Sequence, residues 1–373
     1  MARKPKLSTA VVLLSLCAAS AACSASAAPS RRSLVDPFPL RFPLAEAGSL
    51  EIDGLIAGQP RAQGDVVYCL TREGYLTAVA VPSRAVLWRF KADHPISSSP
   101  EIHGDFVLFH DDGGVLYGIV RPGLALLKRA FAPQVTTPAH IFEGGVVFGT
   151  GDGAVMASAP DGDQAHGSKL PGPEAGITAG PVPVRDKDGG LALTLFGRAD
   201  GRLQAIGKGG RPAWEFRAEG AVAADPAQMG RHIFFGDTQR MFYCLDAFSG
   251  KVNWRRRLQG APLHPAVVRG GTVAVAASNS VVYRLARRGG SILSWEPVPS
   301  RIVYELAAAG PLVLVSSASP TVTALDLRTG RSAGRYDASG PLVAGAVWSS
   351  PYVIVFVGDE ESGRQRIVFL RSR

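Results

Sequence analysis

The sequence predicts an all-β fold, an eight-bladed β-propeller whose blades are four-stranded antiparallel sheets. Apolar runs of four to eight residues recur about every forty residues, which is typical of a repeat architecture built from strands. The 43 Gly and 27 Pro interrupt the chain between these runs, and no segment offers a convincing amphipathic helix. The eight runs begin at Val67, Val107, Val146, Leu193, Ile233, Val273, Val313 and Val353.

Each unit is interpreted as one blade. In the second unit, the apolar residues 106–109 and 115–120 flank residues 111–114, where Asp and Gly tolerate the positive φ of a tight hairpin turn. Comparable turns are expected at Gly74, Gly153 and Gly201. Four strands of five or six residues, joined by short turns, fill about forty residues and make one propeller blade.

The two ends of the chain are predicted to close the ring together. The last unit stops after its third strand, residues 367–370, whereas residues 38–44 form an extra strand ahead of the first unit. This N-terminal strand can supply the missing outer strand of the last blade and cover an exposed sheet edge. We therefore expect a single propeller domain over residues 38–373, preceded by a flexible tether over residues 28–37.

Residues 1–27 are interpreted as an export signal, because a basic start is followed by a short apolar run and then by small residues. Residues 20–23 resemble a bacterial lipobox, which predicts lipidation of Cys23 and a periplasmic protein anchored to the outer membrane. The alternative is cleavage after Ala27, which would remove Cys23. Of the remaining cysteines, Cys69 and Cys244 lie four units apart, so we expect buried free thiols rather than a disulfide.

Charge does not favour a nucleic-acid partner. The chain has 40 Lys and Arg against 31 Asp and Glu, a net charge of +9, of which three positive charges belong to the predicted signal. The basic residues are scattered along the chain, apart from residues 255–257 and 287–288. Nucleic-acid binding usually needs a continuous basic surface, so we expect none here.

The fifth unit contains a recognisable turn motif with Cys244, Asp246, Ser249, Gly250 and Trp254. Asp and Ser can satisfy the amides of a turn, Gly tolerates its backbone conformation, and Trp can cover a small residue. Parts of the motif are assigned in the other units to Ala78, Trp88, Ala205, Trp214, Trp295, Ala324, Asp326, Thr329 and Gly330.

This motif resembles the tryptophan-docking motif of pyrroloquinoline-quinone (PQQ) dehydrogenases and their non-enzymatic relatives, with Cys244 in place of Ala and Ser249 in place of Thr. With a lipoprotein signal and eight blades, the chain resembles the BamB family of outer-membrane assembly lipoproteins. The resemblance implies a monomeric, non-catalytic scaffold that binds a protein partner of the outer-membrane assembly machinery. It implies neither enzyme activity nor a cofactor.

The alternative function is an enzyme or ligand-binding propeller with its site in the axial funnel, where each blade contributes a residue. Local chemistry gives this alternative little support. The chain lacks the adjacent Cys pair of the quinone enzymes, and its seven His show no zinc spacing. His103 and His110 are expected to be surface imidazoles, and the pairs Asp111–Asp112 and Glu360–Glu361 to lie at solvated hairpin tips.

Two departures from the mean repeat occur: one over residues 161–176, with a further charged loop over residues 185–190, and the other over residues 358–366. Loop insertions on a rigid scaffold often carry recognition, although insertions are also tolerated without a function. Both interpretations remain open from the sequence.

Overall fold

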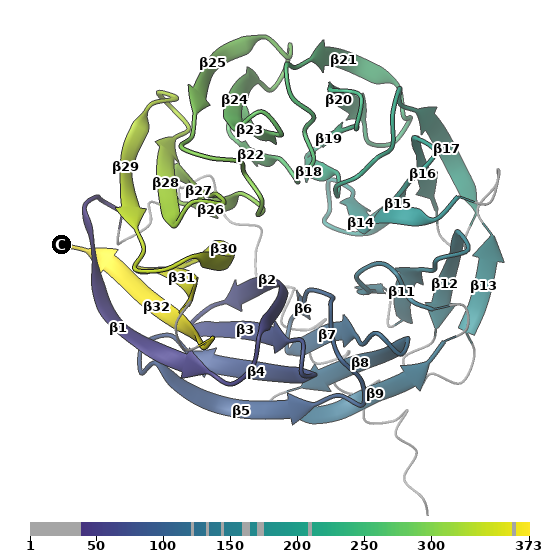
Figure 1. The fold of residues 1–373 in the computed structure, drawn as a ribbon. Coiled ribbons are helices and arrows are strands. Elements are labelled where there is room, and N and C mark those ends of the chain that lie inside the picture. The colour runs from purple at the N-terminus through teal and green to yellow at the C-terminus, as the bar shows by residue number, and fades with distance from the viewer. Residues whose placement is uncertain are drawn as a thin grey trace, which may run out of the picture.

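The structure, a computed structural model, describes residues 39–120, 123–131, 134–142, 145–158, 165–169, 175–207, 211–359 and 363–373. These residues form eight four-stranded antiparallel sheets arranged in a ring and contain no helix (Figure 1). The predicted eight-bladed propeller is confirmed. Within the described ranges there is accordingly no helix long and apolar enough to cross a membrane.

Seven blades consist of consecutive strands, the first next to the ring axis and the fourth at the rim (Figure 1). The first four blades are β2 (Ile56–Gln63), β3 (Val66–Thr71), β4 (Tyr75–Ala80) and β5 (Ala85–Lys91); β6 (Glu101–His103), β7 (Phe106–His110), β8 (Val115–Val120) and β9 (Leu124–Ala130); β10 (His140–Phe142), β11 (Gly145–Gly149), β12 (Ala154–Ser158) and β13 (Ala165–Lys169); and β14 (Ile177–Arg185), β15 (Leu191–Arg198), β16 (Arg202–Ile206) and β17 (Pro212–Arg217). The next three are β18 (Ala227–Met229), β19 (His232–Gly236), β20 (Met241–Asp246) and β21 (Val252–Arg257); β22 (Val267–Arg269), β23 (Thr272–Ala277), β24 (Val281–Ala286) and β25 (Ile292–Pro297); and β26 (Ala307–Ala309), β27 (Leu312–Ser316), β28 (Thr321–Asp326) and β29 (Ser332–Asp337).

The eighth blade combines the two ends of the described chain. Its sheet has the order β1-β32-β31-β30, formed by β30 (Leu342–Ser349), β31 (Tyr352–Gly358), β32 (Gln365–Ser372) and the N-terminal β1 (Leu44–Ile52). Strands β1 and β32 pair antiparallel along their whole length, so the N-terminal strand becomes the outer strand of the last blade. The predicted closure of the ring is thereby confirmed.

The closing strand lies later in the chain than the sequence analysis placed it. Residues 39–43 are not in a strand, and β1 begins at Leu44 instead of extending from residue 38. The physical reason is that Pro39 and Pro43 have no amide proton to donate to a ladder. Leu40 and Leu44 are nevertheless buried in the core cluster of the seventh and eighth blades.

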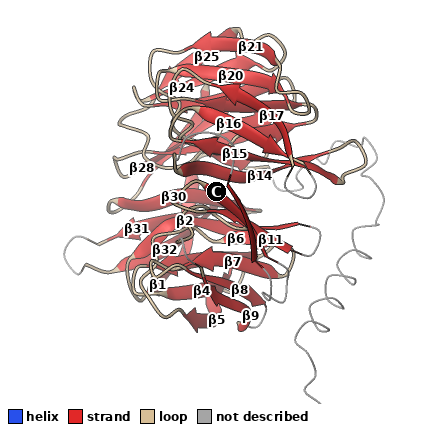
Figure 2. Ribbon diagram, turned by 90° about the vertical axis from the view of Figure 1, so that its right-hand side faces the viewer, coloured by secondary structure: helices blue, strands red, loops and turns tan. Residues whose placement is uncertain are grey.

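The apolar core lies mainly between neighbouring blades. In one cluster, Tyr68 and Leu70 of the first blade pack against Val107 and Tyr117 of the second. Figure 2 shows the strands of neighbouring blades stacked against one another. Since sheets bury their faces by packing on other sheets, the junction between blades is the unit of stability in this fold.

Candidate functional site

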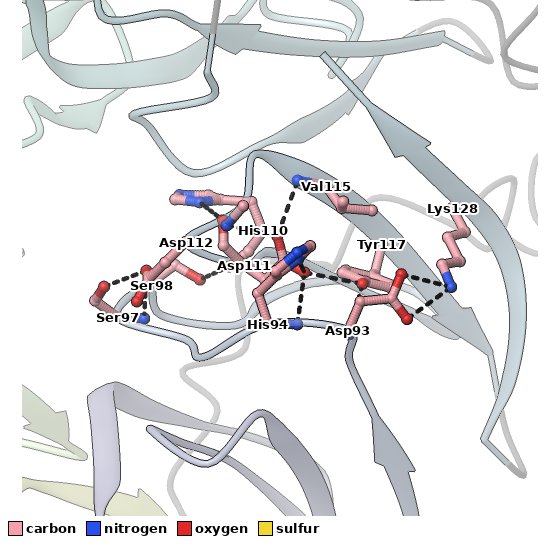
Figure 3. Close-up of polar contacts among 11 residues, drawn as sticks. Asp93, His94, Ser97, Ser98, His110, Asp111, Asp112, Val115, Tyr117 and Lys128 are labelled. Carbon is pink, nitrogen blue, oxygen red and sulfur yellow. Dashed lines mark hydrogen bonds and ion pairs between the residues drawn. The ribbon is translucent and has the colours of Figure 1, made fainter. Parts of the chain in front are cut away.

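A buried carboxylate, Asp111, organises the turn between β7 and β8 (Figure 3). Its side chain is fully buried. One oxygen, Oδ1, accepts hydrogen bonds from the amides of Gly113 at 3.1 Å and Val115 at 2.9 Å. The other, Oδ2, accepts from the hydroxyl of Tyr117 at 2.9 Å and from the amide of His94 at 3.2 Å. The His94 imidazole Nδ1 lies 3.0 Å from the same oxygen.

This network ties the second blade to the first. The hydroxyl of Tyr117 accepts the amide of Asp93, which follows the outer strand of the first blade. Burial alone would raise the pKa of Asp111, but hydrogen bonds from Val115, His94 and Tyr117 outweigh burial and hold the pKa below its ordinary value. The expectation of a solvated Asp111 is therefore wrong, because the neighbouring blade covers this turn; Asp112 is exposed as expected.

The fifth blade contains the same arrangement, built on Asp237 and Tyr243. The Asp237 side chain is fully buried and accepts the Tyr243 hydroxyl at 2.9 Å and the Met241 amide at 2.9 Å. It also accepts the amides of Glu219 and Gly220, at 3.1 and 3.0 Å, from the end of the fourth blade. We call these pairs, Asp111–Tyr117 and Asp237–Tyr243, the Asp–Tyr clamps.

The duplication indicates what the clamps do. Gly220 takes the place of His94 in the second copy, so the clamp does not need an imidazole. An arrangement that resembles an acid–base pair is thus accounted for by its hydrogen bonds to the preceding blade. The clamps were not predicted from the sequence, although Asp and Tyr lie six residues apart across a hairpin at the same point of two repeats, which was a usable signal.

Tryptophans of the repeat motif lie at the junctions between blades. Trp254 lies opposite Cys244 in its own sheet, and its ring packs on Gly290 of the sixth blade. A Cβ added to Gly290, at φ +65°, would lie 2.4 Å from that ring. The Trp254 indole also donates to the carbonyl of Arg287 at 2.9 Å. Ring and indole proton together hold the sixth blade against the fifth.

Trp214 and Trp88 occupy the same position in the fourth and first blades. Trp214 lies opposite Ala205, packs on Gly250 of the next blade and donates to the carbonyl of Ala247 at 3.1 Å. Trp88 lies opposite Ala78 and packs on the following blade in the same way. The motif residues assigned in these blades therefore lie together at junctions.

The motif turn of the fifth blade has the expected roles for Asp246 and Gly250, but not for Ser249. Asp246 Oδ1 accepts the amides of Phe248 and Ser249 at 3.1 and 3.0 Å, and Gly250 has φ +68°. The Ser249 hydroxyl donates to Asp246 at 2.9 Å rather than accepting an amide of the turn. Burial would raise the pKa of Asp246, but hydrogen bonds from Arg231, Ser249 and the turn amides lower it.

The seventh blade has the motif turn but no tryptophan at the docking position. Asp326 Oδ1 accepts the amide of Thr329 at 3.1 Å, and Gly330 has φ +76°. The docking position opposite Ala324 is Gly334, and a Cβ there would lie 2.4 Å from Phe42. An aromatic residue of the N-terminal segment thus fills the space beside Gly334.

The sixth blade departs from the motif. Trp295 is 61% exposed and lies opposite Tyr283, one residue beyond the docking position, so its assignment to the docking motif is wrong. The docking position is Ser294, opposite Arg284. Arg284 donates to the Leu327 carbonyl at 3.2 Å and to the Ser294 hydroxyl at 3.0 Å. The guanidinium thereby replaces the indole donor of the other junctions.

A second group of charges, half-buried, lies near the ring axis. Arg61 of β2 lies 2.8 Å from Glu305, which precedes β26, and 3.7 Å from Glu101 of β6. Burial raises the pKa of Glu101 to about 7, although Arg61 opposes the rise, and burial also raises the pKa of Asp225. A cavity of about 750 Å³ adjoins this group and is lined in part by Gln59, Glu305 and residues of the second, sixth and eighth blades.

The histidines are less exposed than predicted. His103 and His110 are half-buried, so the expectation of surface imidazoles is wrong. The rings of His103 and His140 lie 4.6 Å apart at neighbouring inner strands, and burial lowers their pKa values to about 4 and about 3. In the part of the chain that the structure describes, no cluster of three metal-ligating side chains occurs.

Both cysteines of the propeller are buried free thiols, as predicted. Burial raises the pKa of the Cys69 thiol and raises that of Cys244 to about 11. Neither is suited to nucleophilic chemistry, which requires the thiolate.

The long loops are only partly described. Residues 185–190 form a closed turn in which Asp186 accepts the amides of Asp188 and Gly190, both at 2.9 Å. Most of residues 161–176, the pair Glu360–Glu361, the export signal and Cys23 lie outside the described residues.

Comparisons with known proteins agree with this geometry. A PQQ-repeat family model, described as outer membrane protein assembly factor BamB, matches residues 199–349. The crystal structure of BamB from Moraxella catarrhalis superimposes with a TM-score of 0.71 at 17% identity, covering 87% of this chain and 99% of that one. The chain is a β-propeller, and its residues 199–349 resemble the PQQ-repeat family of BamB.

The likeness to BamB in solved structures concerns the fold. The crystal structure of the computationally designed Ika8 protein superimposes equally well, with a TM-score of 0.73 at 16% identity, covering 87% of this chain and 99% of that one. No curated protein sequence matches the chain. The BamB resemblance therefore carries function only as a proposal.

Proposed function

We propose that this chain is an exported, non-catalytic propeller that binds a protein partner and assists the assembly of outer-membrane β-barrel proteins. The observation that carries the proposal is the match of residues 199–349 to the family model described as outer membrane protein assembly factor BamB. Lipidation of Cys23 would anchor the propeller at the periplasmic face of the outer membrane.

The polar networks are compatible with a scaffold. The carboxylates of the Asp–Tyr clamps and of the motif turns accept hydrogen bonds from backbone amides. These carboxylates therefore stabilise turns and blade junctions. A rigid disc with two faces and a rim then offers surfaces for partners without chemistry of its own.

The test is a pull-down of the tagged, full-length protein from its native membranes, combined with the intact mass of its N-terminus. We expect a lipidated Cys23 and recovery of an outer-membrane assembly protein. The matched variant Cys23→Ala should lose the lipid mass and leave the membrane fraction. An unlipidated protein that recovers no membrane partner would refute the proposal.

A second candidate function is small-ligand binding in the axial cavity, and the charge group of Arg61, Glu101, Asp225 and Glu305 favours it. These residues lie in, or just before, the inner strands of four blades. Glu305 lines the cavity, and Arg61 pairs with it at 2.8 Å. Native mass spectrometry of protein isolated from its host would detect a retained ligand. A mass excess that disappears in Glu305→Gln would support this candidate, and its absence from both proteins would count against it.

A further inference from the structure

One position on the outer strands, at the rim, is charged in five of the eight blades and is Trp295 in the sixth. Glu215, Arg255, Trp295 and Arg335 follow one another at intervals of forty residues, at the same place on the outer strands of the fourth to seventh blades. The corresponding residues of the first and second blades are Arg89 and Lys128. All five charged side chains are between 37% and 67% exposed. Trp295, at 61% exposure, occupies a site that is charged in five other blades.

The rest of β25 extends this apolar stretch. Leu293 is 46% exposed and Ile292 43%, whereas Glu296, the charged residue of the strand, is half-buried. β25 is the last strand of its sheet, so its outer edge lies at the rim (Figure 1). An edge strand leaves every second amide and carbonyl unpaired, and proteins protect such edges with charged side chains. The β25 edge lacks that protection except for Pro297, which limits pairing to the residues before it.

The surroundings of β25 are basic. Arg288, in the turn leading into β25, is exposed and forms no ion pair with any described residue. On the neighbouring β21, Arg255 is 66% exposed and has only a distant acidic neighbour, Glu219 at 3.9 Å. An apolar, aromatic edge flanked by two exposed cations, one unpaired and one weakly paired, complements an extended segment in which apolar residues alternate and acidic residues lie at the end.

We propose that the outer edge of β25 binds an extended, acidic and apolar segment of a partner protein as a fifth strand, with Trp295 and Leu293 as its side-chain contacts. Main-chain hydrogen bonds would supply affinity, and the exposed indole would supply the anchor that makes this edge differ from the other rims. This inference rests on the proposed role as a protein-binding propeller.

The experiment combines a variant with a cross-link. Trp295→Arg gives β25 the rim charge of the neighbouring blades, and Arg335→Ala alters the same position of the seventh blade as a matched control. In the membrane pull-down, we expect Trp295→Arg to reduce partner recovery by about tenfold or more, and Arg335→Ala to leave it unchanged. The two variants should melt within about 2 °C of the parent protein, because the position is exposed.

The cross-link identifies the occupant. A photo-reactive amino acid in place of Leu293 should capture one extended partner segment with alternating apolar residues and an acidic end, whereas the same label in place of Arg335 should not. Undiminished recovery with Trp295→Arg would overturn the inference and leave the proposed function intact. Failure of the parent protein to recover any partner would overturn both. A cross-link to a second copy of the propeller would show self-association instead and would also overturn the inference.

Discussion

The fifth and sixth blades are neighbours with nearly the same strand lengths and a forty-residue offset, yet they use different chemistry at three equivalent positions. The fifth blade has Asp237 in its clamp, Asp246 in its turn and Trp254 at its junction. The sixth has Ala277, Ala286 and Ser294 at these positions. Both sets of residues are compatible with a four-stranded blade. The repeat therefore requires backbone pairing and a packed junction between blades, and not particular side chains at these positions.

Substitutes in the sixth blade restore part of what is missing. Asn279 donates to the Tyr283 hydroxyl at 3.3 Å, where the fifth blade uses Asp237. Arg284 donates to the Leu327 carbonyl, where the fifth blade uses the Trp254 indole. The fifth blade is therefore expected to depend on a few strong contacts, and the sixth on more dispersed ones.

The largest expected effect is at the Trp254 junction. Trp254→Ala removes a ring that is 9% exposed and leaves a cavity against Gly290, so we expect a loss of about 3–5 kcal/mol in the free energy of unfolding. Urea denaturation of the two proteins measures it. Trp295→Ala is the matched control. Equal losses of unfolding free energy in the two variants would show that the fifth and sixth blades do not differ in their dependence on these tryptophans.

The second largest effect on stability is expected at the Asp237–Tyr243 clamp. Asp237→Ala leaves the Tyr243 hydroxyl and the buried Met241 amide without their partner, which should lower the free energy of unfolding by roughly 2–3 kcal/mol. Asn279→Ala in the sixth blade removes a longer, partly exposed hydrogen bond, and we expect less than about 1 kcal/mol. Thermal unfolding would rank the pair, and the reverse order would contradict the structural role of the clamp.

The Arg284 junction should be intermediate. Arg284→Ala leaves the Leu327 carbonyl unpaired at an expected loss of about 1–2 kcal/mol. The double variant Arg284→Ala with Ser294→Trp rebuilds the arrangement of the fifth blade and should recover that loss. If the double variant is less stable than Arg284→Ala alone, the two junctions are not interchangeable.

The Asp246 turn predicts a pH dependence. Asp246→Ala should lower the free energy of unfolding by about 1 kcal/mol at pH 7. Because folding lowers the pKa of Asp246, its carboxylate stabilises the fold above its unfolded pKa of about 4, and this stabilisation is lost as the pH falls through the lower folded value. The difference between parent and variant should therefore shrink below about pH 4. A difference in unfolding free energy that stays constant from pH 7 to pH 3 would show that the ionised Asp246 carboxylate does not stabilise the fold.

The smallest expected effect on stability is at Trp295. Trp295→Ala should change the free energy of unfolding by less than about 0.5 kcal/mol, because the ring is exposed. A large loss of unfolding free energy would mean that the indole stabilises the fold. Partner binding would then not be needed to explain why Trp295 occupies this position.

Periodic signals in the sequence predicted the fold correctly. The forty-residue spacing, the short apolar runs and the missing last strand predicted the blade number and the closure by an N-terminal strand. Prediction from the sequence failed where a shift of one residue in the strand decides whether a side chain is buried at a junction or exposed. Trp295 and Trp254 are one residue apart in the repeat, and alternation along a strand turns neighbouring side chains to opposite faces. Asp111 was misjudged because the covering residues belong to another blade.

By itself, the sequence determined the class of fold, the order of the strands and the two buried thiols, because these follow from local pattern and repeat length. Only the tertiary structure decided which polar side chains are buried and which residues meet at the axis. Arg61 and Glu305 are 244 residues apart, and ring closure alone brings them within 2.8 Å. The physical reason is that each blade buries its faces against other blades, so burial and charge pairing at a junction depend on residues outside the repeat in question.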